Sequence, residues 1–186
     1  ETWKARESGY TSPGSWRPFE FNGEEVDAQV MLADFSKPTL EQALWGKASI
    51  AKVATHTATP QMVEPARIIN SLHPVSIKRY GDSCWLIDFG KCLTGFVEIN
   101  FSPLQTNQKV MIEYADCLEA NEKFPDNRRG DFKDIYFATR KKNEKFINKF
   151  NFHGFRYIKL SGIRRTPKAE DIQAHLIHTD YGTGAR

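Results

Sequence analysis

Two histidines near the end of the chain, His175 and His178, carry the side chains most often found as metal ligands. Imidazoles three residues apart converge on one metal ion when the segment is helical. The stretch from Ile172 to His178 is instead expected to be a strand, in which positions i and i+3 face opposite sides of the sheet. We therefore predict no metal site here, and no cofactor.

A second group of polar side chains lies between Leu118 and Lys133, which we predict to be a long loop. Long loops on rigid β scaffolds are where function tends to lie. An Arg-Gly-Asp tripeptide and a partial calcium-loop pattern also occur there, but both are weak signals because short motifs arise by chance. A solvated loop is the competing interpretation. The candidate carbohydrate or interdomain contacts are Asn127, Arg128, Arg129 and Asp131.

The run FNFHGFRYIKL, residues 150–160, combines aromatic, histidine and arginine side chains. One interpretation is a sugar-binding face formed by His153, Arg156 and Tyr157, which would need these side chains on one exposed side. Strand alternation places Arg156 and Tyr157 on opposite sides, so we favour a bend in an aromatic β core. The predicted structural core motif is Phe152, His153, Gly154, Phe155 and Tyr157, with glycine supplying backbone freedom at the bend.

Catalytic signatures are absent from the sequence. It has no Gly-x-Ser-x-Gly elbow, no phosphate-binding glycine loop and no His-Glu-x-x-His motif. The adjacent pair Glu24 and Glu25 does not define the separation of several ångströms between carboxylates that a glycosidase needs. We predict no catalytic residue in this chain.

Charge and cysteine usage exclude some partners. The 26 Lys and Arg residues and 23 Asp and Glu residues are mixed along the chain, so we predict no nucleic-acid partner. The sequence has no apolar run of membrane-spanning length, so we predict no membrane contact. The three cysteines lack zinc-site spacing and are expected to be buried thiols.

Hydrophobic periodicity predicts the elements that must hold these residues. From about Pro74, alternating runs recur with turn residues between them, at the spacing of an antiparallel sandwich. The fold class is therefore all-β, an antiparallel β-sandwich of the jelly-roll or lectin-like kind with an irregular N-terminal segment. The predicted strands are 84–89, 95–101, 109–115, 134–138, 146–152, 155–160 and 172–178.

Several phrases in the second half occur in a familiar order. Asp88-Phe89-Gly90 is followed by the strand that ends Glu113-Tyr114, by Asp134-Ile135-Tyr136, by the run 150–157, and by His178-Thr179-Asp180. This order resembles the β-sandwich domain of bacterial α-L-rhamnosidases of glycoside hydrolase family 78. Upstream, residues 22–28 (NGEEVDA) are similar to the segment that precedes this domain in the family. Departures at Lys91, Cys92 and Leu93 concern substrate identity more than fold.

The resemblance implies a division of labour within a larger enzyme. Its catalytic acids would lie on an (α/α)₆ barrel that follows the sandwich, and the chain ends about where that barrel would begin. We therefore expect a non-catalytic accessory domain of an α-L-rhamnosidase that docks on this barrel and hydrolyses nothing alone. The alternative is an autonomous carbohydrate-binding module for rhamnose-containing glycans.

Two further expectations concern domain limits and location. Residues 1–60 are predicted to be the end of a preceding domain or a linker, and residues 61–186 to be the sandwich. The chain opens without a methionine, so a leader or larger N-terminal portion is expected to have been removed. The resemblance implies a secreted or periplasmic location, with a cytoplasmic one left open.

Overall fold

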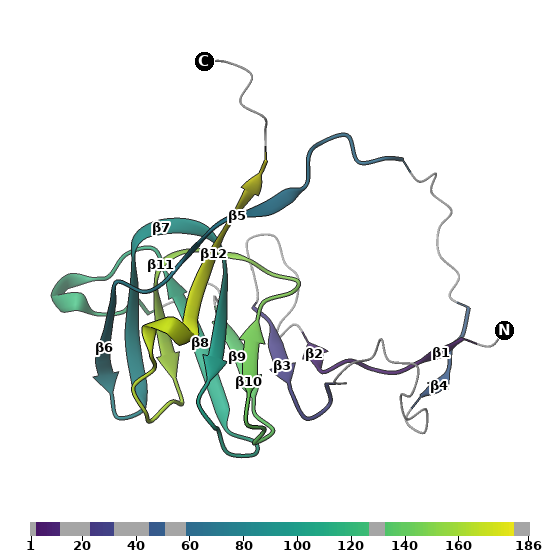
Figure 1. Ribbon diagram of the computed structural model, residues 1–186, viewed down its shortest axis with the longest axis horizontal. Helices are drawn as coiled ribbons and strands as arrows, with labels where there is room; N and C mark the ends of the chain where they lie inside the picture. The colour runs from purple at the N-terminus through teal and green to yellow at the C-terminus, as the bar shows by residue number, and fades with distance from the viewer. Residues whose placement is uncertain (1–2, 12–22, 32–44, 51–58, 127–132, 181–186) are drawn as a thin grey trace.

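Strands dominate the computed structural model, which describes residues 3–11, 23–31, 45–50, 59–126 and 133–180 (Figure 1). The predicted all-β sandwich is confirmed. The strands are β1 (Lys4–Ala5), β2 (Tyr10–Thr11), β3 (Glu25–Asp27), β4 (Gly46–Lys47), β5 (Ala66–Leu72), β6 (Ser76–Gly81), β7 (Cys84–Phe101), β8 (Lys109–Ala115), β9 (Lys133–Phe137), β10 (Glu144–Ile147), β11 (His153–Ser161) and β12 (Ile172–Thr179). Single turns of 3-10 helix are η2 (Ala120–Glu122) and η3 (Ala169–Asp171).

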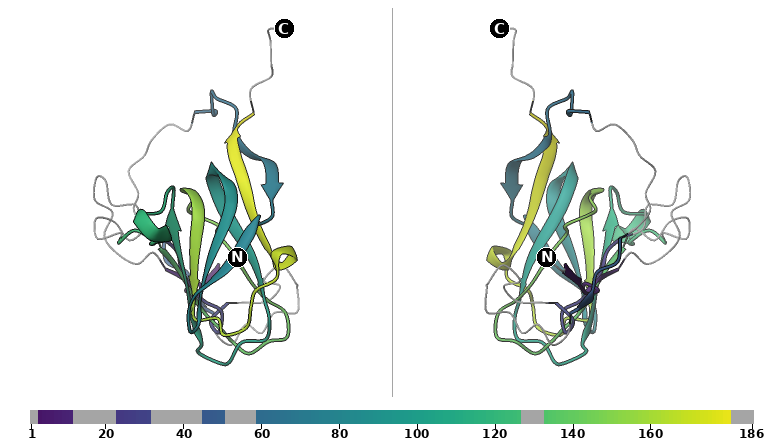
Figure 2. Two further views of the ribbon diagram at one scale, coloured as in Figure 1. Left: turned by 90° about the vertical axis from the view of Figure 1, so that its left-hand side faces the viewer. Right: turned by 90° about the vertical axis from the view of Figure 1, so that its right-hand side faces the viewer.

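The sandwich forms because β7 belongs to both layers. Its first part pairs with β6 and β11, and β11 continues to β8, β9, β3 and β2. Its last part pairs with β12 and β10, and β12 continues to β5. The two layers are visible from the side in Figure 2. We predicted two strands where the structure has one, because the turn-like Gly90, at φ +80°, bends β7 without ending it.

Alternation along the strands forms the core between the layers. Val97, Ile99 and Phe101 of β7 are buried, whereas Asn100 is exposed, as the period of two predicts. In β8, Val110, Ile112 and Tyr114 likewise face inward. Burial of each large apolar side chain stabilises the fold by about 1.5–3 kcal/mol.

One glycine is required where the layers meet. A Cβ atom on Gly95 would lie 1.8 Å from the backbone oxygen of His175, far inside van der Waals contact. Because β7 and β12 pair at this point, any side chain at position 95 would push the two strands apart.

The first layer is extended by the N-terminal segment. β3 pairs with β9 in a parallel arrangement, and β2 pairs with β3. This parallel pair is an exception within the antiparallel sandwich that we predicted. It is possible because β3 comes from a distant part of the chain and needs no tight turn to reach β9. The predicted division at residue 60 stays a prediction.

Helices contribute little to the described residues. Both η2 and η3 have three residues, and no helix in the described part of the chain has the length and apolar character needed to cross a membrane.

Candidate functional site

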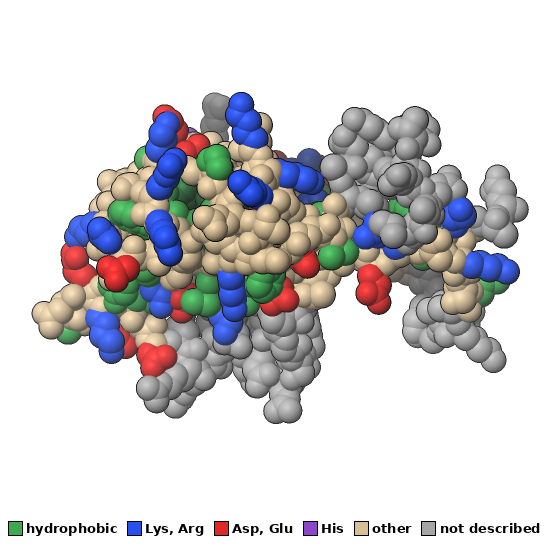
Figure 3. All heavy atoms as spheres, turned by 90° about the horizontal axis from the view of Figure 1, so that it is seen from below, with side chains coloured by type: hydrophobic (Ala, Val, Ile, Leu, Met, Phe, Trp, Pro, Cys, Tyr) green, Lys and Arg blue, Asp and Glu red, His purple; other side chains and the backbone are tan. Residues whose placement is uncertain are grey.

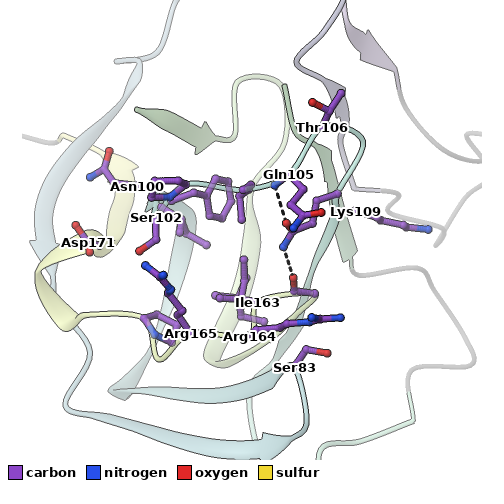
Figure 4. A pocket seen from close by; sticks show the side chains of 18 of the residues that line it. Ser83, Asn100, Ser102, Gln105, Thr106, Lys109, Ile163, Arg164, Arg165 and Asp171 are labelled. Atoms are coloured by element: carbon purple, nitrogen blue, oxygen red, sulfur yellow. Dashed lines mark hydrogen bonds between the residues drawn. The ribbon is translucent and has the colours of Figure 1, made fainter. Parts of the chain in front are cut away.

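A polar cavity of about 740 Å³ lies at the end of the sandwich where β7 stops and β8 starts (Figure 4). Two loops surround it, residues 102–108 and residues 162–167. Its inner wall contains the buried apolar residues Ile99, Phe101, Leu104, Leu160 and Ile163, and its mouth is polar. An apolar wall with a few polar groups is typical of small-molecule sites.

Gln108 holds the two loops together. Its side-chain oxygen accepts a hydrogen bond from the backbone N–H of Gln105 at 2.8 Å, and its amide donates to the carbonyl of Gly162 at 2.7 Å (Figure 4). Gly162 has φ +90°, a left-handed conformation that suits glycine, and a Cβ there would lie 2.2 Å from the carbonyl oxygen of Lys109. The shape of the cavity mouth is therefore determined by the backbone as well as by side chains.

The charged groups of the cavity are three cations, Lys109, Arg164 and Arg165, and one carboxylate, Asp171. Arg165 extends into the cavity toward Ser102, whereas the Lys109 ammonium points away from it (Figure 4). Both arginines are exposed, and neither makes a hydrogen bond or ion pair with another described residue. Lys and Arg side chains are spread over this end of the molecule (Figure 3).

An apolar groove of about 1030 Å³ lies at the opposite end of the sandwich. Its lining includes Leu93, Phe152, Phe155, Leu176 and Ile177. Phe155 is buried in its floor, while Phe152 stands at its rim with 57% of its surface exposed. We call this surface the apolar groove below.

Two cysteines also line the apolar groove. Cys92 and Cys117 are exposed, and the thiol of Cys92 lies 3.4 Å from the backbone oxygen of Asp116. The expectation of buried thiols is therefore wrong for this pair. Cys92 lies within β7, two residues past Gly90, and Cys117 follows the end of β8; both side chains are exposed rather than packed between the layers. The hydrogen bond and charge of Asp116 raise the pKa of the Cys117 thiol.

A smaller cavity of about 500 Å³ contains Asp88, Arg156 and Tyr157. A β-bulge in the pairing of β11 with β7, between Phe155 and Tyr157, places Arg156 over the Tyr157 ring, with 4.8 Å from the guanidinium carbon to the ring centroid. Arg156 also donates two hydrogen bonds to Asp88, at 2.9 and 3.0 Å, which hold the pKa of that carboxyl below its usual range. The predicted separation of Arg156 from Tyr157 by strand alternation is therefore wrong, because the bulge shifts the alternation.

A buried polar network lies beneath the apolar groove and is centred on Asp134, which is fully buried. Its carboxylate accepts hydrogen bonds from the Glu24 backbone N–H at 2.6 Å, from the Asn148 amide at 2.7 Å and from the Tyr114 hydroxyl. The ring of His153 stacks on Tyr114 with 3.9 Å between centroids. His153 Nε2 lies 3.3 Å from Asp134, without the alignment of a hydrogen bond.

The carboxylate of Glu24 connects this network to the loop before β11. It accepts hydrogen bonds from the backbone N–H groups of Lys149, Phe150 and Asn151 at 2.6–3.0 Å. Neither Asp134 nor Glu24 is exposed. We therefore assign this network a role in the fold rather than in ligand binding.

Buried tyrosines predict an alkaline limit to stability. Burial, followed by the charge and hydrogen bond of a neighbouring carboxylate, raises the pKa of both Tyr114 and Tyr136 above the usual value of about 10. At neutral pH both hydroxyls are protonated in the folded and in the unfolded state, so their ionisation does not change the stability of the protein there. Above pH 10 only the unfolded state ionises, and we expect stability to fall by about 1–3 kcal/mol per pH unit.

The measurement is urea unfolding from pH 8 to 12, with tyrosinate absorbance recorded in parallel. Of the six tyrosines, Tyr114 and Tyr136 should ionise only as the protein unfolds. Ionisation of all six before unfolding would contradict this expectation.

Comparison with known proteins adds to this geometry. The family model of the bacterial alpha-L-rhamnosidase concanavalin-like domain matches residues 78–178, which is more than half of the chain. The chain belongs to this family. Among curated relatives, the alpha-L-rhamnosidase of an Alteromonas species is 28% identical over 97% of the chain, and one from Formosa agariphila is 26% identical over 94%. The chain spans about a fifth of the length of each of these relatives.

Solved structures support the same fold. The alpha-L-rhamnosidase of Dictyoglumus thermophilum superposes with a TM-score of 0.78 at 23% identity, covering 87% of this chain and 18% of that one. The Streptomyces avermitilis alpha-L-rhamnosidase, solved with L-rhamnose, gives 0.77 at 22% identity, covering 84% and 16%.

The predicted contact residues of the domain lie outside the described residues. Asn127, Arg128, Arg129 and Asp131 all fall within 127–132. The described part of the same segment contains η2, and Phe124 there is buried against Leu86 and Ala115. A role for the four residues in binding remains a prediction.

Only some residues of the predicted core motif are buried in the structure. His153 and Phe155 are buried, and Tyr157 is partly buried. Assignment of Phe152 to the core is wrong, because it precedes β11 and its side chain stands at the rim of the apolar groove. Gly154 is exposed with open space beside it, and β11 begins at His153, so these residues are strand rather than a bend.

Other residues were placed by the structure alone. His175 is buried and its Nδ1 lies 2.8 Å from the Ser71 hydroxyl, whereas His178 is exposed. No described group of three or more His, Cys, Asp or Glu side chains could hold a metal ion. Arg165 and Asp171 of the polar cavity were not predicted from the sequence. One feature of the sequence could have indicated the cavity. Residues 102–108 and 162–167 both follow predicted strands that end on the same side of an antiparallel meander.

Proposed function

We propose that this domain is a non-catalytic accessory module of an α-L-rhamnosidase, and that it packs through the apolar groove against an (α/α)₆ catalytic domain. The observation that carries the proposal is the position of the groove. It includes Ile177, His178 and Thr179 at the end of β12, within ten residues of Arg186, so a domain that follows in the chain would be tethered close to it. A tethered partner is favoured at such a site because the linker keeps its local concentration high.

The surface chemistry of this end supports a protein partner. Phe152 at the groove rim and Ile68 on β5 are more than half exposed, and Ile68 pairs with Ile177 across the β5–β12 ribbon. This ribbon extends beyond the rest of the sandwich (Figure 1). Contiguous exposed apolar side chains mark interaction surfaces. An autonomous carbohydrate-binding module would not require them.

The activity and location of the whole protein are part of the proposal. The relatives named alpha-L-rhamnosidase are about five times as long as the aligned segment, which leaves room for a catalytic domain. We infer that hydrolysis of rhamnosides takes place on that domain. A secreted or periplasmic location would suit an enzyme that acts on external glycans.

The first test is the size of the native protein that contains this chain. An antibody raised against the 186 residues should detect a polypeptide several times longer in the source cells. The flanking catalytic segment is then expressed separately, and its association with the 186-residue chain is measured by calorimetry. Detection of a native protein of 186 residues, or absence of association, would contradict the proposal.

Two exposed phenylalanines provide a matched pair for the association experiment. Phe152 lines the groove, and Phe150, two residues earlier and 79% exposed, does not. We expect Phe152→Ser to weaken association about fivefold or more, since loss of a buried aromatic contact costs about 1 kcal/mol or more. Phe150→Ser should leave association nearly unchanged. Equal effects of the two substitutions would argue against the groove as the contact.

A further inference from the structure

We propose that the polar cavity at the other end of the domain binds an anionic sugar unit, whose charge comes from a carboxylate or a sulfate ester. The choice of a saccharide rests on the proposed function, whereas the negative charge follows from the cavity itself. This site is separate from the apolar groove, since the two lie at opposite ends of the strands.

Arg165 supplies the group that would recognise the charge. Its guanidinium extends into the cavity and has no partner among the described residues (Figure 4). A planar guanidinium with free donors binds carboxylate or sulfate oxygens through two parallel hydrogen bonds. By contrast, Arg156 is already engaged with Asp88 and is not free for such a contact.

The remaining lining suits a sugar ring. Ser102 and Asn100 lie on the wall that Arg165 faces, and Asp171 lies beside them (Figure 4). Hydroxyl, amide and carboxylate groups exchange hydrogen bonds with sugar hydroxyls. The Asp171 carboxylate would repel the acidic group of the sugar. This repulsion would orient the acidic group away from Asp171 and toward Arg165.

The size and stiffness of the cavity also support a ligand. Its volume of about 740 Å³ lies within the 300–1,000 Å³ common for ligand sites. Its two loops are joined by the hydrogen bonds of Gln108, so the mouth is formed before any ligand arrives. Preorganisation lowers the entropy lost on binding.

The test is an NMR titration of the 186-residue chain with sodium glucuronate, glucose 6-sulfate and neutral glucose. We expect saturable shifts of the backbone amides of Gln105 and Gly162 with at least one of the two anions, and weaker binding of glucose. Comparison of the two anions distinguishes carboxylate from sulfate. Anions that bind no more tightly than glucose would overturn the proposal.

The variant Arg165→Ala should weaken binding of the anion about tenfold or more, because one charge-assisted contact is lost. Arg67→Ala is the matched control, since Arg67 is an exposed arginine on β5, away from the cavity. Unchanged binding in Arg165→Ala, or an equal loss in both variants, would overturn the proposal. If the chain does not associate with the catalytic segment but still binds glucuronate, only the proposed function is refuted. If it associates with that segment but does not bind glucuronate, only this inference is refuted.

Discussion

Replacement of Asp134 by alanine is expected to lower the free energy of unfolding by about 3–5 kcal/mol. The carboxylate is fully buried and accepts hydrogen bonds from Tyr114, Asn148 and the backbone of Glu24. Its removal takes the acceptor from the Asn148 amide and the Glu24 N–H and leaves the Tyr114 hydroxyl only a 3.4 Å contact with the Asn148 side-chain oxygen; each unsatisfied group costs about 1–3 kcal/mol. Urea unfolding followed by circular dichroism measures the change.

The control for this substitution is Asp82→Ala. The side chain of Asp82 is fully exposed, and its ion pair with Arg79 is 3.6 Å long. Surface substitutions of this kind change stability by no more than about 0.5 kcal/mol. If Asp134→Ala had as small an effect as Asp82→Ala, the buried hydrogen bonds of Asp134 would not stabilise the fold, and the structural role assigned to the network would be wrong.

Replacement of Phe155 by alanine is expected to destabilise the domain by about 3–5 kcal/mol, which corresponds to a fall in melting temperature of roughly 10 °C. Phe155 is 1% exposed, and its ring makes edge contacts with Phe89 at 5.7 Å and Tyr114 at 5.2 Å between centroids. The truncation leaves a cavity between β7, β8 and β11 that rigid strands cannot close. Thermal unfolding of the variant tests this expectation.

Phe152→Ala is the comparison, since it removes the same atoms three residues earlier in the chain. Because Phe152 is 57% exposed, its loss should cost well under 1 kcal/mol. The two values together show whether Phe155 belongs to the core and Phe152 does not. Comparable losses from both would contradict the division between rim and floor of the apolar groove.

The bulge in the pairing of β11 with β7 explains why strand periodicity was misleading at Arg156 and Tyr157. A regular strand sends neighbouring side chains to opposite faces, and our prediction used that rule. Pairing with β7 skips from Phe155 to Tyr157, which leaves Arg156 free to lie over the adjacent ring. A bulge depends on the partner strand, so periodicity in one segment does not reveal it.

The polar cavity was beyond sequence analysis for a related reason. Arg165 and Ser102 are more than sixty residues apart, and they face one cavity because β7 and β11 both end at the same side of the sandwich. Sequence analysis instead favoured residues 127–131, since polar residues in one long loop are close in sequence. A cluster of polar residues in one loop is weak evidence for a binding site when the tertiary fold brings distant loops together.

Alternation of apolar residues by itself determined the all-β class and the core faces of β8 and the second part of β7, because burial of one face of a strand imposes a period of two. The order of phrases along the chain determined the resemblance to rhamnosidase sandwich domains. Tertiary structure alone decided that β7 spans both layers, that β3 adds to β9 in parallel, and that the two ends of the sandwich differ in chemistry. These features depend on contacts between residues far apart in the chain, which no local pattern encodes.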